Sequence, residues 1–595
     1  MCLGSLQSIG IIDSIAPALD SEMNGIRMAA AFALGQTFHP SAVPLLISAL
    51  EKDTVKLVKG MLFDALGKTG DVSNLLWLAT QKAEFQESEG QAQGILRFAL
   101  RGLVVPEGNE KMLEIIKEGS STVGVTYASY HLGRYADSLW LANHAKDLQE
   151  LYFGERDEMV RSNIIKAIIK ARGKEAWPLA EATLKSDADY RVKVNIIQSL
   201  SHKSWEKAGK LMYEIACGQD PNQAIAAAES IQRLASESDL RNHIRAAKKT
   251  KNWRARALLL GKAMEISTTK KNLPGKIEKR IIALYNGTEN VAEKACLLKC
   301  LAPDPEKYGF VEAQMKSGPQ MVSTYAMETL TLMRKSLNFE KSSDNLILQD
   351  IDLDEEFLRI FKTGIRSGDL AIVSMAASVL RDPDLNYKEL IKDIGFIEEA
   401  LKAAGSPEMA EARGELISSM EYFSGKKSGY TAAPAYNHPI DWERVMNIPP
   451  KQLVEFVTSK GEIVVQLNVN WCPGTVSAFL ELVESGFYNN GVIHRVVPNF
   501  VVQDGCPRGD GWGGPPFTLR SEFTPAPFME GTLGMASAGK DTEGSQWYFT
   551  HSATPHLDGK YTNFGFVVSG IEIVHQLEVG DVIEKVEVIR ESEAR

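Results

Sequence analysis

The hydrophobic positions in the first 420 residues recur with a helical period, in units that resemble one another. The segment Ile26–Gly35 is echoed by Val58–Gly67, and equivalent apolar positions fall at about 34, 66, 100, 132, 168, 200, 231 and 260. This spacing of roughly 32 residues gives room for two helices and their turns. Because one helix pair cannot bury its apolar face alone, the pattern predicts a stacked α-solenoid.

Small residues and proline mark the helices within each unit. The run Ala29–Ala31 permits close helix approach, and the Ala-Leu-Gly sequences ending at Gly35 and Gly67 predict a left-handed C-cap. Ser41–Leu50 and Trp177–Leu184 place a proline in the first turn, followed by apolar residues at helical spacing. These two segments therefore predict the partner helices of their units.

The units resemble short bacterial HEAT repeats. From about residue 270 to 420 the repeat weakens, so we expect degenerate units there, and the acidic stretch Asp344–Glu356 indicates a loop or insertion. Solenoids of this kind usually offer a curved surface to a protein, so a protein partner on the solenoid surface is expected. Some bacterial HEAT proteins resemble phycobilisome lyases, which handle bilin chromophores, but no residue selects that alternative.

The helical period ends at Phe423–Pro439, where Gly, Ser, Pro and Ala concentrate, and an alternating pattern follows. We therefore predict a solenoid at residues 1–422, a linker at 423–449 and a second domain at 450–595. Many short strands with two helices predict a closed antiparallel β-barrel plugged at its ends. Strands are expected at 462–469, 492–497, 500–503, 531–536, 547–550, 563–568 and 582–589, and helices at 473–486 and 571–577.

Composition narrows the classes of function. The net charge of the 595-residue chain is −10 and no Lys/Arg-rich block stands out, so no nucleic-acid partner is expected. No run approaches the roughly 18 to 20 apolar residues of a membrane span, and no basic region precedes an apolar core at the N-terminus. As it stands the sequence predicts a cytoplasmic protein; a truncated N-terminus would make an exported, periplasmic protein the alternative.

The cysteines indicate no disulfide framework and no metal site. Six are spread over the chain, which favours a reducing compartment. Cys296 and Cys300 lie four apart on a helical pattern and could form half a metal site, but no second pair completes it. We therefore predict two core thiols, with neither metal nor cofactor.

Two further motifs are rejected. Gly509–Gly514 matches G-x-G-x-x-G, but Pro515 and Pro516 follow it instead of a helix that could hold a pyrophosphate. A Ser/His hydrolase is disfavoured, because neither Ser537 nor Ser545 lies in G-x-S-x-G.

Four stretches of the second domain carry the strongest signal: Ile493–Gln503, Gly534–Gly539, Gly544–Phe549 and His556–Gly565. In this order and at these spacings they resemble the cyclophilin family of peptidyl-prolyl cis/trans isomerases, over about residues 450 to 590. The resemblance implies an eight-stranded barrel with two capping helices and an active site on its outer face. It also implies action on Xaa-Pro bonds of proline-containing protein or peptide clients.

The chemistry of prolyl cis/trans isomerisation favours an arginine as the catalytic residue. Isomerisation must break amide resonance over a barrier of roughly 18 to 20 kcal/mol, but it cuts no covalent bond. A fixed cationic donor aimed at the pyramidal nitrogen of the twisted amide stabilises that state more than the planar one. Arg495 matches the arginine that the family uses as this donor, and a guanidinium stays charged and directional.

The resemblance implies roles for the other site residues, position by position. Gln503 would hydrogen-bond the substrate carbonyl, as the second catalytic residue. The implied substrate-binding residues are Phe500, Val501, Tyr548 and Leu557 as walls of the proline pocket, the backbone of Ala536, Ser537 and Ala538, and Gly511, Gln546, His556 and Tyr561 in the matched groove.

Some positions depart from the usual cyclophilin pattern. Val501, Ser537, Tyr548 and Tyr561 replace Met, Asn, Phe and His, which leaves the arginine chemistry intact. His556 replaces the tryptophan associated with tight cyclosporin binding, so weak cyclosporin sensitivity is predicted. Cys506 stands where a small acidic residue is frequent and is expected to be an exposed thiol. The alternative function is a non-catalytic proline-recognition or scaffold protein, which would need neither Arg495 nor Gln503.

Overall fold

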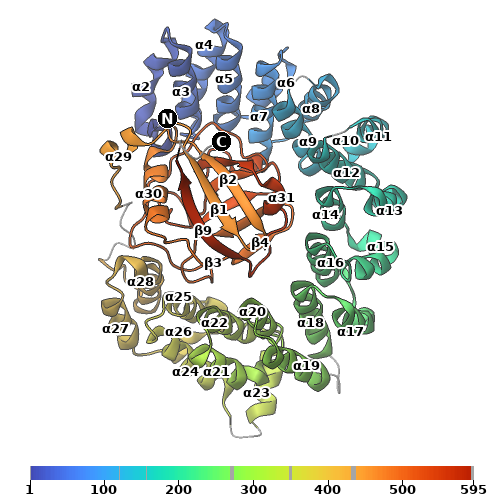
Figure 1. Ribbon diagram of the computed structural model, residues 1–595, viewed down its shortest axis with the longest axis vertical. Coiled ribbons are helices and arrows are strands. Elements are labelled where there is room, and N and C mark those ends of the chain that lie inside the picture. The colour runs from blue at the N-terminus through green and yellow to red at the C-terminus, as the bar shows by residue number, and fades with distance from the viewer. Residues whose placement is uncertain are drawn as a thin grey trace.

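A computed structural model describes residues 2–119, 121–155, 157–268, 274–347, 351–429 and 437–590. Helices as far as Ser424 form a curved array that encircles a β-rich C-terminal unit (Figure 1). The predicted order, a helical region followed by an antiparallel β unit, is confirmed. The array consists of α1 (Cys2–Leu6), α2 (Ile12–Ile15), α3 (Asn24–Gly35), α4 (Val43–Lys52), α5 (Lys56–Thr69), α6 (Val72–Thr80), α7 (Gln86–Leu100), α8 (Pro106–Glu118), α9 (Thr122–Arg134), α10 (Ser138–Asn143), α11 (Ala145–Gly154), α12 (Glu158–Arg172), α13 (Trp177–Ser186), α14 (Tyr190–Gln198), α15 (His202–Ile215), α16 (Pro221–Leu234), α17 (Leu240–Lys249), α18 (Trp253–Thr268), α19 (Pro274–Gly287), α20 (Val291–Lys299), α21 (Tyr308–Ser317), α22 (Gln320–Arg334), α23 (Phe339–Ile347), α24 (Leu353–Ile365), α25 (Leu370–Leu380), α26 (Tyr387–Leu390), α27 (Gly395–Ala403) and α28 (Ala410–Ser424).

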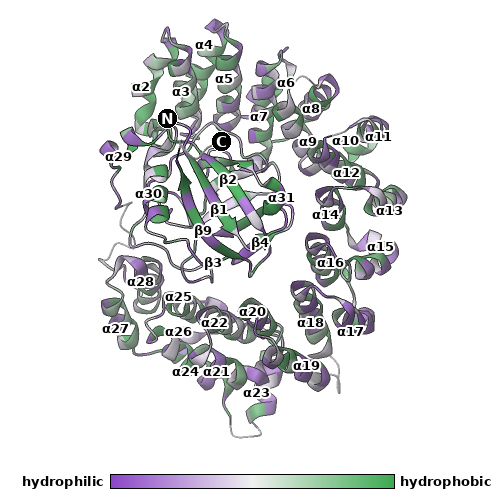
Figure 2. Ribbon diagram, viewed as in Figure 1, coloured by the Kyte–Doolittle hydropathy of each residue, from purple (hydrophilic) through white to green (hydrophobic). Residues whose placement is uncertain are grey.

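The array has an inner row of helices that pack on one another in succession: α3, α5, α7, α9, α12, α14, α16, α18, α20, α22, α25 and α28. The other long helices lie outside this row, away from the C-terminal unit (Figure 1). The repeated apolar positions of the sequence fall in or directly after the inner helices α3 to α18. In Figure 2 the helices carry hydrophobic and hydrophilic residues side by side, as expected when each buries one face.

The glycines of the Ala-Leu-Gly sequences do not act as left-handed caps, so that prediction is wrong. Gly67 lies inside α5, and neither it nor Gly35 has a positive φ. They permit close helix packing instead: a Cβ on Gly67 would lie 2.2 Å from the carbonyl oxygen of Gly94 on α7, and one on Gly35 would lie 2.8 Å from Cα of Ala65.

The partner helices appear where proline predicts them, as α4 and α13. The acidic stretch Asp344–Glu356 is mostly helical rather than a loop, because α23 extends to Ile347 and α24 begins at Leu353, whereas residues 348–350 lie outside the described residues. Cys300 is buried at the end of α20, and its Sγ lies 3.3 Å from the carbonyl oxygen of Cys296. Across the described ranges, no helix combines the length and apolar composition that crossing a membrane requires.

The C-terminal unit is one curled antiparallel sheet of nine strands in the order β3-β9-β1-β2-β8-β6-β7-β5-β4. Its edges are β3 and β4, and no ladder joins them in the part of the chain that the structure describes. The sheet is therefore open, and the prediction of a closed barrel is wrong. β1 is a strand that the sequence did not predict. The unit comprises α29 (Trp442–Asn447), β1 (Leu453–Thr458), β2 (Gly461–Leu467), α30 (Pro473–Glu484), β3 (Gly491–Val492), β4 (Arg495–Val497), β5 (Val501–Asp504), β6 (Thr532–Met535), β7 (Trp547–Thr550), β8 (Asn563–Ser569), α31 (Ile571–Val574) and β9 (Val582–Ile589).

The concave side of the sheet packs an aromatic core against α30. The Phe456 ring lies 5.0 Å from the Trp547 ring and 5.3 Å from that of Phe549, and all three side chains are fully buried. Glu522 satisfies the start of α30, since its carboxylate accepts hydrogen bonds from the backbone N–H groups of Gly474 and Thr475 at 3.1 and 2.7 Å. The opposite side of the sheet is therefore left for the site.

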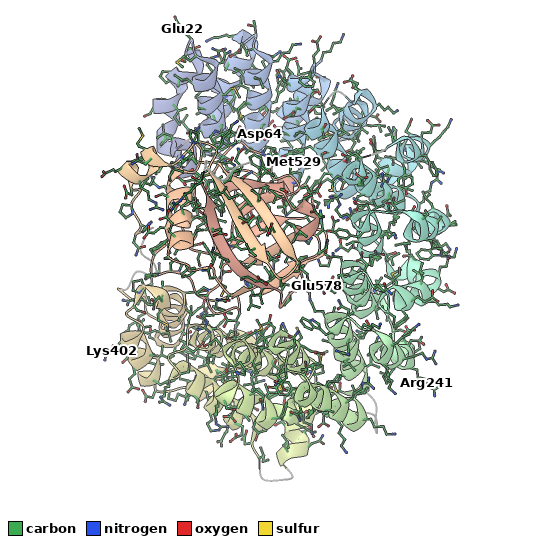
Figure 3. The ribbon with its side chains drawn as sticks, in the orientation of Figure 1. Glu22, Asp64, Arg241, Lys402, Met529 and Glu578 are labelled. Carbon is green, nitrogen blue, oxygen red and sulfur yellow. The ribbon has the colours of Figure 1, made fainter. Side chains whose placement is uncertain are left out.

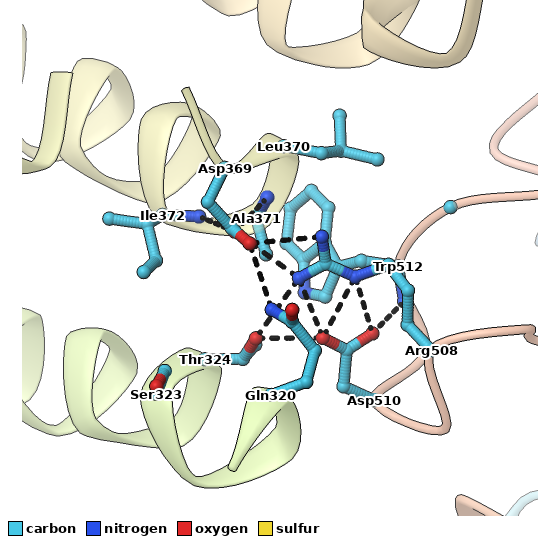
Figure 4. A network of polar contacts seen from close by, with 12 residues as sticks. Gln320, Ser323, Thr324, Asp369, Leu370, Ala371, Ile372, Arg508, Asp510 and Trp512 are labelled. Carbon is cyan, nitrogen blue, oxygen red and sulfur yellow. Dashed lines mark hydrogen bonds and ion pairs between the residues drawn. The ribbon is translucent and has the colours of Figure 1, made fainter. Parts of the chain in front are cut away.

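The inner row of the array contacts the β unit directly. Asp64 on α5 and Met529 of the β unit lie on facing sides of this interface (Figure 3). On the far side, Arg508 pairs with Asp369 at the start of α25, at 3.0 Å, and with Asp510 at 2.9 Å (Figure 4). Thr324 on α22 donates to Asp510 at 2.7 Å. The array thus binds the loop that leads to Gly511 through hydrogen bonds and an ion pair.

Candidate active site

Arg495 begins a chain of polar side chains that crosses the sheet. It lies on β4 directly opposite Gln503 on β5, and its Nη1 donates to Gln503 Oε1 at 2.9 Å. Gln503 Nε2 donates to Gln546 Oε1 at 3.1 Å, and Gln546 Nε2 donates to the carbonyl oxygen of Gly511 at 2.9 Å. The structure therefore brings four of the predicted site residues into one hydrogen-bonded row.

The guanidinium of Arg495 has no carboxylate partner among the described residues, and the residue is exposed. Desolvation by neighbouring atoms lowers its pKa from the usual value, with a small opposing effect from Tyr561. An arginine remains charged even so, because the pKa of a guanidinium lies far above neutral pH. Arg495 therefore forms no salt bridge with a described carboxylate, and its N–H groups are available to a ligand.

Beside this row lies a cluster of apolar side chains, which are the predicted walls of the proline pocket, and we refer to this cluster below as the pocket. Val501, Tyr548 and Leu557 are buried in one cluster, with Phe500, Ala536 and Tyr561 at its edge. Phe528 belongs to the same cluster, is fully buried, and stacks on Tyr548 with ring centroids 6.0 Å apart. Sequence reasoning missed Phe528, because it lies in an irregular, proline-containing segment without periodicity.

His556 forms the outer side of this pocket and is supported from behind by a residue of the array. Its ring stacks on Phe500 at 5.5 Å and on Tyr130 of α9 at 6.2 Å. The Tyr130 hydroxyl and His556 Nδ1 are 2.9 Å apart and share a hydrogen bond. Burial, followed by the nearby cations Arg134 and Lys560, lowers the pKa of His556 to about 4. The imidazole is therefore neutral near pH 7, as suits a pocket wall.

Ala536, Ser537 and Ala538 form the remaining edge of the groove. The backbone N–H of Ala536 donates to the carbonyl oxygen of Gln546 at 2.9 Å, and that of Ala538 donates to Thr542 Oγ1 at 3.0 Å. Here the groove opens into a cavity of about 500 Å³. Its lining includes Gln503, Gly511, Ala536, Ser537, Ala538 and Gln546 from the β unit, and Leu370, Pro407 and Glu408 from the array. The thirteen predicted site residues thus lie near one another, in the hydrogen-bonded row, in or beside the apolar cluster, or around the cavity.

Two neighbouring residues are structural. The His494 side chain is buried, with Nδ1 3.5 Å from Asp504 Oδ1. Cys506 is not the exposed thiol that we expected. It is 2% exposed, Sγ lies 2.9 Å from the carbonyl oxygen of Trp512, and burial raises the pKa of the thiol. It packs beneath the Gly511 loop.

Similarity to known proteins identifies the family of the C-terminal unit. Residues 453–593 match the family model described as cyclophilin type peptidyl-prolyl cis-trans isomerase/CLD. The chain is 48% identical to peptidyl-prolyl cis-trans isomerase B of Bacillus subtilis over 118 residues, which are 20% of this chain and 82% of the relative. It is 41% identical over 137 residues to a peptidyl-prolyl cis-trans isomerase of Synechococcus elongatus, covering 23% of this chain and 94% of the relative.

Among solved structures, a Cryptosporidium parvum cyclophilin type peptidyl-prolyl cis-trans isomerase is 30% identical, with a TM-score of 0.23. The alignment covers 23% of this chain and 98% of that one. Through its C-terminal unit, the chain belongs to the cyclophilin-type peptidyl-prolyl cis-trans isomerase family.

Proposed function

We propose that this peptidyl-prolyl isomerase acts on Xaa-Pro bonds of protein clients and assists their folding, with the helical array as a protein-binding scaffold. The observation that carries the proposal is Arg495, a guanidinium without a carboxylate partner in the described chain, placed beside an apolar pocket. The apolar side chains of the pocket match a proline ring in their chemistry, and the amide nitrogen of a ring bound there would lie near the cation.

The proposed mechanism is electrostatic. As the Xaa-Pro amide twists, its nitrogen becomes pyramidal and regains a lone pair, to which Arg495 donates. The interaction is stronger in the twisted state than in the planar one, which is the condition for catalysis. Lowering the barrier by about 7 to 8 kcal/mol would give on the order of a 10⁵- to 10⁶-fold acceleration.

The other residues orient the client. Gln503 would donate from Nε2 to the client carbonyl, either through the second N–H of its amide or in place of the bond to Gln546 Oε1. The backbone from Ala536 to Ala538 would pair with the extended client chain. Phe500, Val501, Phe528, Tyr548 and Leu557 would hold the proline ring away from water.

The array would hold the client protein on its outer helices, since the inner row contacts the β unit. We further propose that residues 1–422 form the scaffold, residues 423–449 the linker and residues 450–595 the isomerase domain. Residues 430–436 of the predicted linker lie outside the described residues.

A refolding experiment tests the proposal. The client is a protein whose refolding is limited by a prolyl isomerisation, and the full chain is added in catalytic amounts. We expect the wild type to accelerate the slow refolding phase. The acceleration by Arg495→Ala should be at least tenfold smaller. Equal refolding rates with and without the wild-type chain would contradict folding assistance and would favour proline recognition without turnover.

A further inference from the structure

We infer that the helical array is part of the isomerase site, because residues of α7 and α9 hold the segment that forms the outer wall of the proline pocket. The inference rests on the proposed function of that pocket. It assigns positioning roles to Arg97, Tyr127 and Tyr130, which come from a region of the chain that the family model does not cover.

The segment in question is Pro555–Gly559, which carries His556 and Leu557. Arg97 on α7 reaches it twice: Nη1 donates to the carbonyl oxygen of Pro555 at 2.7 Å, and Nη2 pairs with Asp558 Oδ2 at 3.0 Å. The other oxygen of Asp558 accepts the backbone N–H of Phe528 at 2.7 Å. One carboxylate therefore joins the array to both the floor and the wall of the pocket.

Helix α9 and the end of α3 add three more contacts to the same segment. The Tyr127 hydroxyl donates to Asp558 Oδ2, and the Tyr130 hydroxyl meets His556 Nδ1. Gln36, directly after α3, donates from Nε2 to the carbonyl oxygen of Gly559 at 2.9 Å. Every residue from Pro555 to Gly559 except Leu557 thus has a hydrogen-bond partner in the array.

Arg97 is itself fixed within the array. Its Nε donates to Asp64 Oδ1 at 2.8 Å, and Asp64 also pairs with Lys68 at 2.6 Å. The side chains of Arg97, Asp64 and Lys68 are only 8%, 7% and 4% exposed. Buried charges are costly unless they are paired, so this network has little freedom to rearrange. The pocket wall is therefore held in position by a rigid part of the array.

Tyr130 has a second support, the guanidinium of Arg134, which lies 3.7 Å from the centre of its ring. The stack runs from Arg134 through Tyr130 and His556 to Phe500. Because Phe500 lines the pocket, a displacement of α9 would move the surface that a proline ring contacts. These residues are positioning residues, since none of them lines the pocket cluster itself.

The test uses the full chain and separates KM from kcat with an Ala-Pro peptide. The variants are Tyr127→Phe, Tyr130→Phe and Arg97→Lys, which keep the ring or the charge. Tyr190→Phe is the matched control, because it removes a hydroxyl that hydrogen-bonds His575 across the same interface at 2.7 Å, outside the Pro555–Gly559 segment. Thermal unfolding of each variant checks that it is folded.

We expect Tyr127→Phe and Tyr130→Phe to raise KM by about three- to tenfold, the range for the loss of one hydrogen bond, with kcat within about twofold of wild type. Arg97→Lys should lower kcat/KM by more than tenfold, and Tyr190→Phe should match the wild type. Folded Tyr127→Phe and Tyr130→Phe proteins with wild-type KM would overturn the inference and leave the proposed function intact. An equal loss in Tyr190→Phe would also overturn it, because the effect would then belong to the interface in general.

Discussion

Arg495 and Gln503 face each other across the β4–β5 ladder, and the guanidinium donates to the side-chain carbonyl of the glutamine at 2.9 Å. The carboxamide of Gln503 is in turn fixed by Gln546 at 3.1 Å. A neutral amide can orient the guanidinium without cancelling its charge. The pair therefore presents an aimed cation beside the apolar pocket, which is the arrangement that the proposed mechanism requires.

The first prediction separates orientation from charge. Gln503→Ala should lower kcat/KM by about five- to tenfold, because Arg495 loses the hydrogen bond that aims it. Gln503→Glu should lower it further, since a carboxylate at this distance would form an ion pair with Arg495. Peptide isomerisation rates check both variants. A Gln503→Glu protein as active as the wild type would show that the free charge of Arg495 is not needed.

The second prediction concerns the hydroxyl of Tyr548. It is buried and has no hydrogen-bond partner in the part of the chain that the structure describes, and burial raises the pKa of the phenol well above its usual value. Tyr548→Phe should therefore stabilise the protein by about 1 to 2 kcal/mol, with isomerase activity retained.

Chemical denaturation monitored at the sheet provides the measurement for Tyr548→Phe. The matched control is Tyr488→Phe, because the Tyr488 hydroxyl is buried but donates to the carbonyl oxygen of Ser545 at 3.2 Å. The control should destabilise the protein by about 1 kcal/mol. Changes of the same sign in both variants would contradict the account of Tyr548.

Local patterns in the sequence predict much of the site. Arg495 and Gln503 are eight residues apart on one hairpin, so their register follows from neighbouring strands. The strands at Trp547–Thr550 and Val582–Ile589 have the predicted bounds, since alternation is a local signal. The helical period likewise predicts the inner row of the array.

The remaining features depend on contacts between distant parts of the chain. Tyr130 is 426 residues from His556, and no periodic pattern relates the two. Whether the sheet closes depends on how β3 and β4 lie relative to each other, which strand propensity does not encode. The glycine at the end of an Ala-Leu-Gly sequence can cap its helix or allow a neighbouring helix to approach closely. Only the packing of α5 on α7 shows that Gly67 allows close approach.

The third prediction concerns pH. Glu543 is fully buried, with Thr562 Oγ1 donating to its carboxyl at 2.8 Å, and burial raises the pKa of this group to about 8. Because the folded state holds this proton more tightly than the unfolded state, its contribution to stability is complete below about pH 4.5 and is lost as pH rises through 8. The loss should amount to a few kcal/mol.

Glu543→Gln should remove this part of the pH dependence, and it should be more stable than the wild type at pH 8.5 but not at pH 4.5. Unfolding temperatures across this range give the comparison. Glu572→Gln, a change at an exposed carboxylate of α31 that forms no ion pair with the described residues, is the control and should leave the slope unchanged. A wild-type slope in Glu543→Gln would assign the pH dependence to other groups.

The most direct test of the central claim, that the charge of Arg495 drives isomerisation, is NMR exchange spectroscopy on a short Ala-Pro peptide. Wild type, Arg495→Ala and Arg495→Lys are compared at equal catalytic concentration, after unfolding curves show that all three are folded. We predict rapid cis/trans exchange with the wild type, a rate at least 100-fold lower with Arg495→Ala, and an intermediate rate with Arg495→Lys. Equal exchange rates for the wild type and Arg495→Ala would contradict the account.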